Sequence, residues 1–427
     1  MKHEGSARDL LIGSFKAALA AADPLQLVPQ HLPQPPKGRT LVVGAGKAAA
    51  AMALAVEQNW PAEAPLDGLV VTRYQHGLLT NRITVIEAGH PVPDEAGATA
   101  AHEILKSVKT LTREDLLLVL LSGGGSSLLS LPADAITIEE LKATTQELLR
   151  SGAPIQDMNT VRKHLSAIHG GKLAAVSRAQ TVALIISDVT GDDPTHIASG
   201  PCAPDPTTYD DALAILERYS VRAPRSVIDH LQSGARGEIT ETPKPGDKVF
   251  RRVENRVIGS AQQSLQAAAE YFQERAIQGV ILGDSVTGEA REVAKVLGAI
   301  ARQIRKHGNP WQPPVALISG GECTVTVHGK GRGGRCAEFL LALGIDLDAL
   351  PEVYALACDT DGIDGSEDNA GAFLAPDTLA RGASKKLHPA RALDENDAYT
   401  YFAAVDALIM TGPTRTNVND YRVVLVR

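Results

Sequence analysis

Asp115–Pro132 read DLLLVLLSGGGSSLLSLP, and the first half of this stretch is typical of a buried strand. Its six apolar residues, Leu116 to Leu121, form a short uninterrupted run that turn residues follow at once. Such a run indicates a strand covered on both faces, as in a parallel sheet. The glycines that follow are therefore expected at the carboxyl edge of that sheet.

The second half of the stretch has the composition of an anion-binding turn. Glycines leave their backbone N–H groups uncovered, the next helix directs its positive end to the same place, and two hydroxyls add donors. A tight strand-to-helix turn that needs glycine only for its backbone angles explains a single such loop equally well. The candidate binding residues here are Ser122, Gly123, Gly124, Gly125, Ser126 and Ser127.

Two further apolar runs end in closely spaced glycines, which favours the anion-binding interpretation. They are Leu41–Lys47 (LVVGAGK) and Val315–Glu322 (VALISGGE). Three such edges in one chain indicate an enzyme that handles phosphate. Lys47 opposes the dipole of the helix that follows it unless an anion shares the site, so we expect this lysine to be functional. The candidate binding residues at these two edges are Gly44, Gly46, Gly320, Gly321 and Glu322.

The composition favours an enzyme of small molecules over other classes of protein. With 427 residues and a net charge of −8, the chain has no basic region of the kind that binds nucleic acid or an anionic membrane. We expect a cytoplasmic protein, because the N-terminus lacks a signal-peptide core and no apolar run reaches the roughly 20 residues of a membrane helix. The four cysteines are scattered, which argues against a disulfide framework and a structural zinc site.

The alternation of predicted strands and helices indicates an α/β protein of two domains. We expect residues 1–240 to form a doubly wound, mostly parallel sheet with Rossmann-like βα units, and residues 241–427 to form a smaller α/β domain. The boundary is placed in the polar, proline-containing segment Gly234–Asp247. An amphipathic helix within residues 7–23 is expected on the outside of the first domain, and the last strand is expected at Ala407–Met410.

Two loops gather carboxylates after predicted strands. The motif SDVTGDD contains Asp188 and Asp193, and the motif DTDGIDG contains Asp359 and Asp361. Carboxylate oxygens at such an edge suit Mg²⁺, which phosphoryl transfer from ATP requires. These four residues are the candidate metal ligands, and Asp188 is also a candidate catalytic residue. Asx turns would give the same composition without a metal.

The glycine-rich segment Gly329–Arg335 carries three positive charges immediately before a predicted helix. The guanidinium of Arg335 could clamp a carboxylate or a transferred phosphoryl group, whereas a solvated hairpin explains the same composition equally well. Residues 411–420 follow the last predicted strand with hydroxyls and amides, among which Thr411 and Asn417 are candidate binding residues.

Taken together, these motifs resemble those of the class II glycerate 2-kinase family, whose C-terminal part is called the MOFRL domain. The resemblance covers nearly the whole chain. The segments that carry it are VVGAGK (42–47), GHPVPDEAG (89–97), LSGGGSSLL (121–129), NTVRKHLSAIHGGKLA (159–174), SDVTGDD (187–193), ASGPCAPDPTTY (198–209), ISGGECTV (318–325), DTDGIDG (359–365) and GPTRTNVND (412–420).

The resemblance implies ATP-dependent phosphorylation of D-glycerate at its 2-hydroxyl, in a cleft between two α/β domains. It implies that Lys47 and Arg335 matter most for catalysis and that ATP and glycerate are the ligands, and it leaves homodimer formation open. One departure concerns Cys336 and Ala337, which stand where the family usually has Asn-Gln. Affinity or the choice of acceptor could differ for this reason.

Two other functions stay open. Family members are often named hydroxypyruvate reductases, and Arg73 could contact the 2′-phosphate of NADP. The GAGK turn is, however, an incomplete dinucleotide fingerprint, because its third small residue is Ala49 and the second predicted strand ends in Thr72 and Arg73 without the acid that binds ribose. A non-catalytic sugar-phosphate sensor would keep the glycine-rich edges but would not need the carboxylate clusters.

Overall fold

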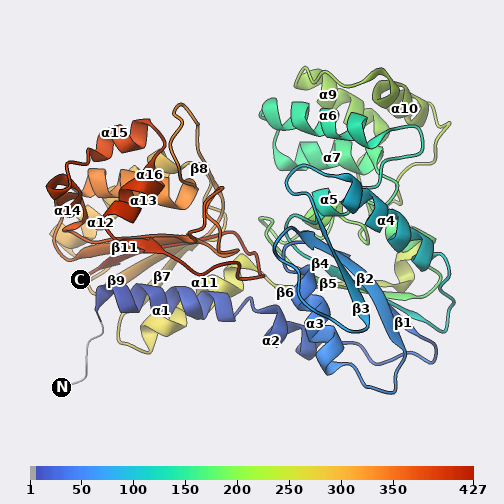
Figure 1. Ribbon diagram of the computed structural model, residues 1–427, viewed down its shortest axis with the longest axis horizontal. Coiled ribbons are helices and arrows are strands. Elements are labelled where there is room, and N and C mark those ends of the chain that lie inside the picture. Colours follow the sequence, from blue (N-terminus) through green and yellow to red (C-terminus); the bar gives the residue numbers. More distant parts are fainter. Residues whose placement is uncertain (1–5) are drawn as a thin grey trace. The chain divides into compact units, whose positions relative to one another are not determined.

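The computed structural model describes residues 6–427, which fold into two compact units (Figure 1). The first unit is Pro24–Ile258, and the second consists of Gly259–Arg427 together with the segment that ends at Asp23. Each unit is built around its own six-stranded sheet. The predicted α/β class is confirmed.

The sheet of the first unit is parallel, as the sequence predicts. Its strands are β1 (Thr40–Ala45), β2 (Leu66–Arg73), β3 (Ile83–Ala88), β4 (Leu116–Leu121), β5 (Gln180–Ile186) and β6 (Val253–Gly259). They lie in the order β3-β2-β1-β4-β5-β6, and β1 to β5 pair in parallel. All residues of β4 are buried, because helices cover both faces of a parallel sheet.

Several helices alternate with or flank the strands of this sheet along the chain. They are α2 (Pro24–His31), α3 (Ala49–Asn59), α4 (Glu95–Val108), α5 (Gly125–Leu128) and α8 (Lys172–Val176), with short 3₁₀ turns at Ile197–Ser199 and Lys248–Arg252. Helix α3 is rich in buried alanines, whose small side chains let it lie close to the sheet. Asp94 is the N-cap of helix α4, and its carboxylate accepts a hydrogen bond from the N–H of Gly97, as N-cap side chains do.

A separate group of helices adds a second core to the first unit. It consists of α6 (Ile138–Arg150), α7 (Ile155–Leu165), α9 (Tyr209–Arg218) and α10 (Arg225–Ala235), which lie together beyond the sheet in Figure 1. Leu148, Val161, Tyr209 and Leu231 are buried between these helices. Capping boxes begin α6 and α9, so both helices have defined starts.

The sheet of the second unit is mixed. Its strands are β7 (Gln278–Gly283), β9 (Val315–Ser319), β11 (Val353–Asp359), β12 (Gly371–Leu374), β13 (Leu408–Ile409) and β14 (Asp420–Val426), in the order β13-β12-β11-β14-β9-β7. Only the β7–β9 pair is parallel among these neighbours. A separate two-stranded ribbon pairs β8 (Gly288–Glu289) with β10 (Cys323–Thr324).

Strand β14 was not predicted, because the last strand was expected at Ala407–Met410. The structure has only the short edge strand β13 there and places β14 between β11 and β9. Asp420 and Arg422 interrupt the apolar pattern of β14, yet both are buried. Their mutual ion pair, with N···O 3.1 Å, lets a charged segment lie in the middle of a sheet.

Helices cover both faces of this second sheet. On one side lie α1 (Ala7–Ala20) and α11 (Ala261–Gln273), and on the other lie α12 (Ala290–His307) and α13 (Arg335–Leu347). The short helices α14 (Thr378–Ser384), α15 (Pro389–Asp394) and α16 (Ala398–Ala404) complete the unit.

Helix α1 belongs to the second unit, which corrects the expectation that it packs on the first domain. Leu11 and Phe15 are buried with residues of α11 and the second sheet. The ring of Phe15 stacks on Tyr421 at 5.8 Å between centroids, and the Tyr421 hydroxyl lies 2.8 Å from Ser14 Oγ. An amphipathic pattern shows which face of a helix is buried but not which sheet covers it.

The division between the units was expected at residues 240–241, and the structure places it elsewhere. It lies at residues 258–259, because β6 joins the first sheet beside β5. The polar segment that was interpreted as a connection is held within the first unit: Thr242 donates to Asp205 at 3.0 Å, and the Asp205 N–H donates to the carbonyl of Pro243 at 2.8 Å.

One stretch of the described residues, Ala7–His31, is long and apolar enough to cross a membrane by length and composition. It comprises two helices, α1 and α2, which belong to different units. The buried residues of α1 contact α11 and the second sheet. Packing within the second unit therefore accounts for the apolar face of α1.

We expect Phe15→Ala to destabilise the second unit selectively. Phe15 is 1% exposed, and the loss of a buried phenylalanine side chain costs about 3–5 kcal/mol. Hydrogen exchange measured by mass spectrometry should become faster in β11 and β14. Lys16→Ala, a change at an exposed position of the same helix, is the control and should leave exchange unchanged. Faster exchange in β1 and β4 instead would contradict the placement of α1.

Candidate functional site

The loops after β1 and β4 meet at the carboxyl edge of the first sheet. The strand order reverses between these two strands, which is the switch point where open α/β sheets bind ligands. The N–H of Lys47 donates to the carbonyl of Gly123 at 2.8 Å, and the N–H of Ala48 donates to Ser122 Oγ at 3.0 Å. Two of the predicted edges, including Lys47, are thus brought together.

The glycines of these loops are required by close packing. Gly46 has φ of 142°, and a Cβ there would lie 2.1 Å from Ser122 Oγ. A Cβ on Gly124, which has φ of 80°, would lie 2.8 Å from the imidazole of His90 and 3.5 Å from the side chain of Lys47. The two loops therefore need glycine at these positions to approach each other closely. His90 and Lys47 both lie beside Gly124.

Ser126 begins a chain of hydrogen bonds that leads to α7. The Ser199 hydroxyl lies 2.9 Å from Ser126 Oγ and 3.1 Å from Asn159 Oδ1. Ser199 is fully buried, and both it and Ala198 have positive φ, of 56° and 50°. Such backbone strain costs about 1–3 kcal/mol per residue and is concentrated at functional sites.

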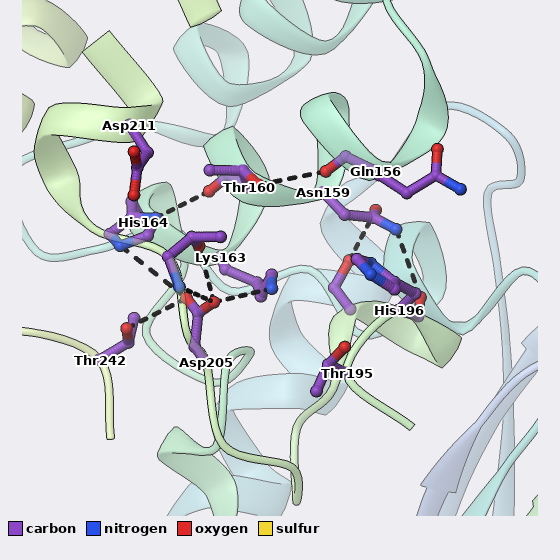
Figure 2. A network of polar contacts seen from close by, with 12 residues as sticks. Gln156, Asn159, Thr160, Lys163, His164, Thr195, His196, Asp205, Asp211 and Thr242 are labelled. Carbon is purple, nitrogen blue, oxygen red and sulfur yellow. Dashed lines mark hydrogen bonds and ion pairs between the residues drawn. The ribbon is translucent and has the colours of Figure 1, made fainter. Parts of the chain in front are cut away.

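A buried ion pair fixes α7 behind this chain, as Figure 2 shows. Lys163 Nζ lies 2.8 Å from Asp205 Oδ1, and both side chains are at most 1% exposed. Burial alone would raise the pKa of Asp205, but the charge and hydrogen bond of Lys163 hold it below its usual value. Burial lowers the pKa of the neighbouring His164. The pair therefore keeps α7, and with it Asn159, in a fixed position.

Arg335 is the centre of a second cluster, in the second unit, at the start of α13. Its Nε lies 2.8 Å from Asp420, one terminal nitrogen lies 2.7 Å from Asp359, and the other lies 2.9 Å from Glu322. Burial alone would lower the pKa of Arg335, but these three carboxylates raise it well above its usual value. Three predicted site residues are thus in direct contact, and Asp420, which was not predicted, completes the cluster.

The segment before Arg335 is a fixed loop, not a solvated hairpin. The N–H of Gly331 donates to the carbonyl of Glu395 at 2.9 Å, and the N–H of Arg332 donates to Asp397 at 2.9 Å. The side chains of Lys330 and Arg332 face solvent, and that of Arg332 is 58% exposed. This loop and Arg335 line a cavity of about 280 Å³.

The residues that depart from the family pattern, Cys336 and Ala337, lie in the apolar core of the second unit. Their backbone N–H groups donate to the carboxylate of Asp364 at 2.9 and 2.8 Å. Asp364 is itself fully buried, and burial raises its pKa to about 7. In this chain the two positions therefore contribute backbone donors to the start of α13, while their side chains are part of the core.

The other predicted residues of the second unit lie in neighbouring loops. Gly321 has φ of 94°, its carbonyl accepts from the N–H of Asp420 at 3.2 Å, and the carbonyl of Gly320 accepts from Arg422. The Thr411 hydroxyl donates to the carbonyl of Gly412 at 2.8 Å, and Asn417 Oδ1 accepts from the N–H of Asn419 at 3.3 Å. The contacts of Thr411 and Asn417 are those of tight turns, whereas the contacts of Gly320 and Gly321 join their loop to β14. The binding roles of all four residues stay predictions.

The carboxylate loops form Asx turns, the alternative raised by the sequence. Asp193 accepts from the N–H of Thr195 at 2.9 Å, Asp359 from that of Asp361 at 3.0 Å, and Asp361 from that of Ile363 at 2.9 Å. Within residues 6–427 no group of three or more His, Cys, Asp or Glu side chains is arranged to hold a metal ion. Coordination of Mg²⁺ by these residues and Asp188 therefore stays a prediction.

Comparison with known proteins identifies the family. The model of a domain of unknown function, DUF4147, matches residues 10–232, and the MOFRL family model matches residues 315–420. A glycerate 2-kinase from Pyrococcus horikoshii is 42% identical over 91% of this chain and 88% of its own length. A D-glycerate 2-kinase from Thermotoga maritima is 38% identical over 99% of both chains. The chain belongs to the glycerate 2-kinase family.

Two more comparisons describe the range of this family. The crystal structure of a glycerate kinase from Thermotoga maritima matches with a TM-score of 0.87 and 37% identity, over 99% of this chain and 100% of that chain. A relative from Agrobacterium vitis, 48% identical over 99% of this chain and 95% of its own length, carries a provisional hydroxypyruvate reductase name. Names within the glycerate 2-kinase family thus cover two kinds of reaction.

Several residues beside the candidate site were not predicted individually. His90, Asn159 and Ser199 contact or approach the loops of the first unit, and Asp420 pairs with Arg335 in the second. All four lie in segments that carry the resemblance to the glycerate 2-kinase family. Their presence in these segments could therefore have indicated that the four residues are functional. It could not have shown which loop each residue contacts.

We expect Arg335→Lys to reduce kcat/KM with D-glycerate and ATP by roughly 30- to 1,000-fold, which corresponds to about 2–4 kcal/mol of transition-state stabilisation. An ammonium group cannot contact three carboxylates in the geometry of a guanidinium. Arg332→Lys is the matched control, because Arg332 faces solvent, and it should lose far less activity. Equal and small losses in both variants would show that the position of Arg335 is not functional.

Proposed function

We propose that the protein transfers the γ-phosphoryl group of ATP to the 2-hydroxyl of D-glycerate and forms 2-phosphoglycerate. The observation that carries this proposal is the position of Lys47. Its backbone hydrogen bond to Gly123 holds it beside the Gly/Ser loop (Ser122–Ser127), at the switch point of the first sheet. Similarity over the full length to D-glycerate 2-kinases supports the identity of the acceptor.

Phosphoryl transfer depends on positioning and on electrostatic stabilisation of the transferred group. In the proposed reaction the backbone and hydroxyls of Ser122–Ser127 bind phosphate oxygens, and the Lys47 ammonium group stabilises the charge that develops on them. Asp188, two residues beyond β5, is the candidate acceptor for the proton of the glycerate hydroxyl.

Arg335 is proposed to act on the same reaction by binding an anionic oxygen. Two of its three carboxylate partners, Asp359 and Asp420, are buried and hold the guanidinium in place, whereas the third, Glu322, is 56% exposed. An anionic ligand group can therefore displace Glu322 without disturbing the buried pairs. Fixed donors of this kind need no reorganisation during the reaction.

Hydroxypyruvate reduction is the second candidate, because the order of the first sheet is that of dinucleotide-binding domains. A relative also carries a reductase name. Strand β2, however, ends at Thr72 and Arg73 without a carboxylate for the ribose of NAD. Incubation with D-glycerate and ATP, compared with hydroxypyruvate and NADPH, distinguishes the two: formation of ADP supports the kinase, and oxidation of NADPH supports the reductase.

We expect Lys47→Ala to abolish phosphoryl transfer and to leave thermal unfolding unchanged. The ammonium group is proposed to stabilise charge in the transition state, and the backbone hydrogen bond of Lys47 does not need the side chain. Lys37→Ala, at an exposed position before β1, is the control. A variant that keeps more than about a tenth of the wild-type kcat would contradict the proposal, since the lysine would then contribute under about 1.4 kcal/mol.

We expect activity to depend strictly on Mg²⁺ or Mn²⁺, which would neutralise negative charge on the phosphates of ATP. The oxygen donors of Asp188 and Asp193 suit these ions. Activity should be lost in excess EDTA and restored by added Mg²⁺, and Asp193→Asn should raise the Mg²⁺ concentration needed for half-maximal rate. Asp188→Asn should in addition lower kcat at saturating Mg²⁺, because Asp188 is also the proposed proton acceptor. Full activity in EDTA would contradict the metal requirement.

A further inference from the structure

A small cavity lies inside the first unit beside the loop that contains Ser126 and Ser127. Its volume of about 20 Å³ exceeds the roughly 10–15 Å³ that one water needs. It therefore has room for a group of a few atoms and excludes a nucleotide. The residues that line it are Pro93, Ser126, Ser127, Ser130, Leu141, Thr145, Arg162, Ser166 and His169.

The charge in this cavity is positive and has no acidic partner. Arg162, in the last part of α7, is the only lining residue with a full charge, and no Asp or Glu lines the cavity. Among residues 6–427, its side chain makes one hydrogen bond, to Asn159 Oδ1, at a long 3.4 Å. Burial lowers the pKa of Arg162 to about 10, so the guanidinium remains protonated at neutral pH.

This arrangement contrasts with that of the neighbouring residue. Lys163 forms a buried ion pair with Asp205 at 2.8 Å, as buried cations generally do. Arg162 is partly buried, and none of residues 6–427 gives it such a partner, which is costly unless a ligand supplies the negative charge. A carboxylate matches the two parallel N–H donors of a guanidinium.

His169 supplies a second unsatisfied group in the same cavity. It is 3% exposed, and within the described part of the chain its Nε2 has no hydrogen-bond partner. Burial, together with the charges of Lys172 and Arg162, lowers its pKa to about 3, so the imidazole is neutral and can donate one hydrogen bond. A buried polar atom without a partner is costly, and an anionic oxygen in the cavity would satisfy it.

The cavity is connected to the proposed phosphate-binding loop through side chains that are already fixed. Ser126 lines the cavity and belongs to the loop after β4, and Ser199 links it to Asn159, the hydrogen-bond partner of Arg162. If the carboxylate of the acceptor molecule paired with Arg162, the rest of that molecule would therefore lie next to Ser126 and the proposed phosphate-binding loop.

We propose that Arg162 binds the carboxylate of the hydroxy acid that is phosphorylated, with His169 as a second donor in this cavity. This inference rests on the proposed kinase function and adds the residue that determines specificity for an acid over a neutral alcohol. Arg162 is a binding residue in this proposal and takes no part in proton or phosphoryl transfer.

The test compares wild type with Arg162→Met, Arg162→Lys and the control Arg218→Met, which changes an arginine that is 65% exposed on α9. Loss of a charged hydrogen bond weakens binding by roughly 10- to 150-fold, so Arg162→Met should raise KM for D-glycerate by about this factor and leave KM for ATP unchanged. Arg162→Lys, which keeps the charge and is the more conservative change for folding, should give a smaller increase. Arg218→Met should behave as wild type.

A second measurement needs no turnover and separates this inference from the proposed function. In calorimetric titrations, propionate should bind to wild type and to Arg218→Met, while propionamide, its neutral analogue, should not. Binding of propionate that Arg162→Met abolishes supports the carboxylate site even if D-glycerate is not phosphorylated. Wild-type KM for D-glycerate in folded Arg162→Met, or propionate binding that is equal in wild type and this variant, would overturn the inference.

Discussion

The parallel pairing of β1 with β4 is the constraint on which the candidate site of the first unit depends. Parallel strands are joined by crossovers, and here β2 lies on one side of this pair and β5 on the other. The loops after β1 and β4 therefore face each other at one edge of the sheet. Hydrogen bonds from Lys47 and Ala48 to the opposite loop fix them there, and glycines at positions 46 and 124 allow the close approach.

Three buried or partly buried cations, Lys163, Arg335 and Arg162, differ in the groups that neutralise their charge. Lys163 and Arg335 have carboxylate partners at 2.7–2.9 Å, so folding itself neutralises their charge and holds their positions. Within the described residues 6–427, the side-chain partner of Arg162 is an amide oxygen at 3.4 Å. Since an unpaired buried charge is costly, Lys163 supports the surrounding structure and Arg335 is held in place by its two buried partners. Arg162 is suited to a ligand that brings its own negative charge.

The fold by itself does not decide the reaction. The strand order of the first unit is shared with dinucleotide-binding enzymes, and related chains carry both kinase and reductase names. The distinction rests on particular residues at the carboxyl edge, because unrelated chemistries use the same sheet. Here Lys47 lies beside the Gly/Ser loop, and β2 ends in an arginine where a ribose-binding acid would stand.

The sequence by itself determined the α/β class, the buried strand Leu116–Leu121 and the glycine-rich edges, because apolar runs and turn residues are local signals. Through motif resemblance it also predicted Lys47 and Arg335 as site residues, and their roles stay predictions. Tertiary structure alone decided that α1 packs in the second unit, that β6 joins the first sheet and that Arg422 lies inside β14. The contacts of Arg162, His169 and Ser199 were likewise decided only by the fold. Each of these depends on partners far away in the chain, which local patterns do not specify.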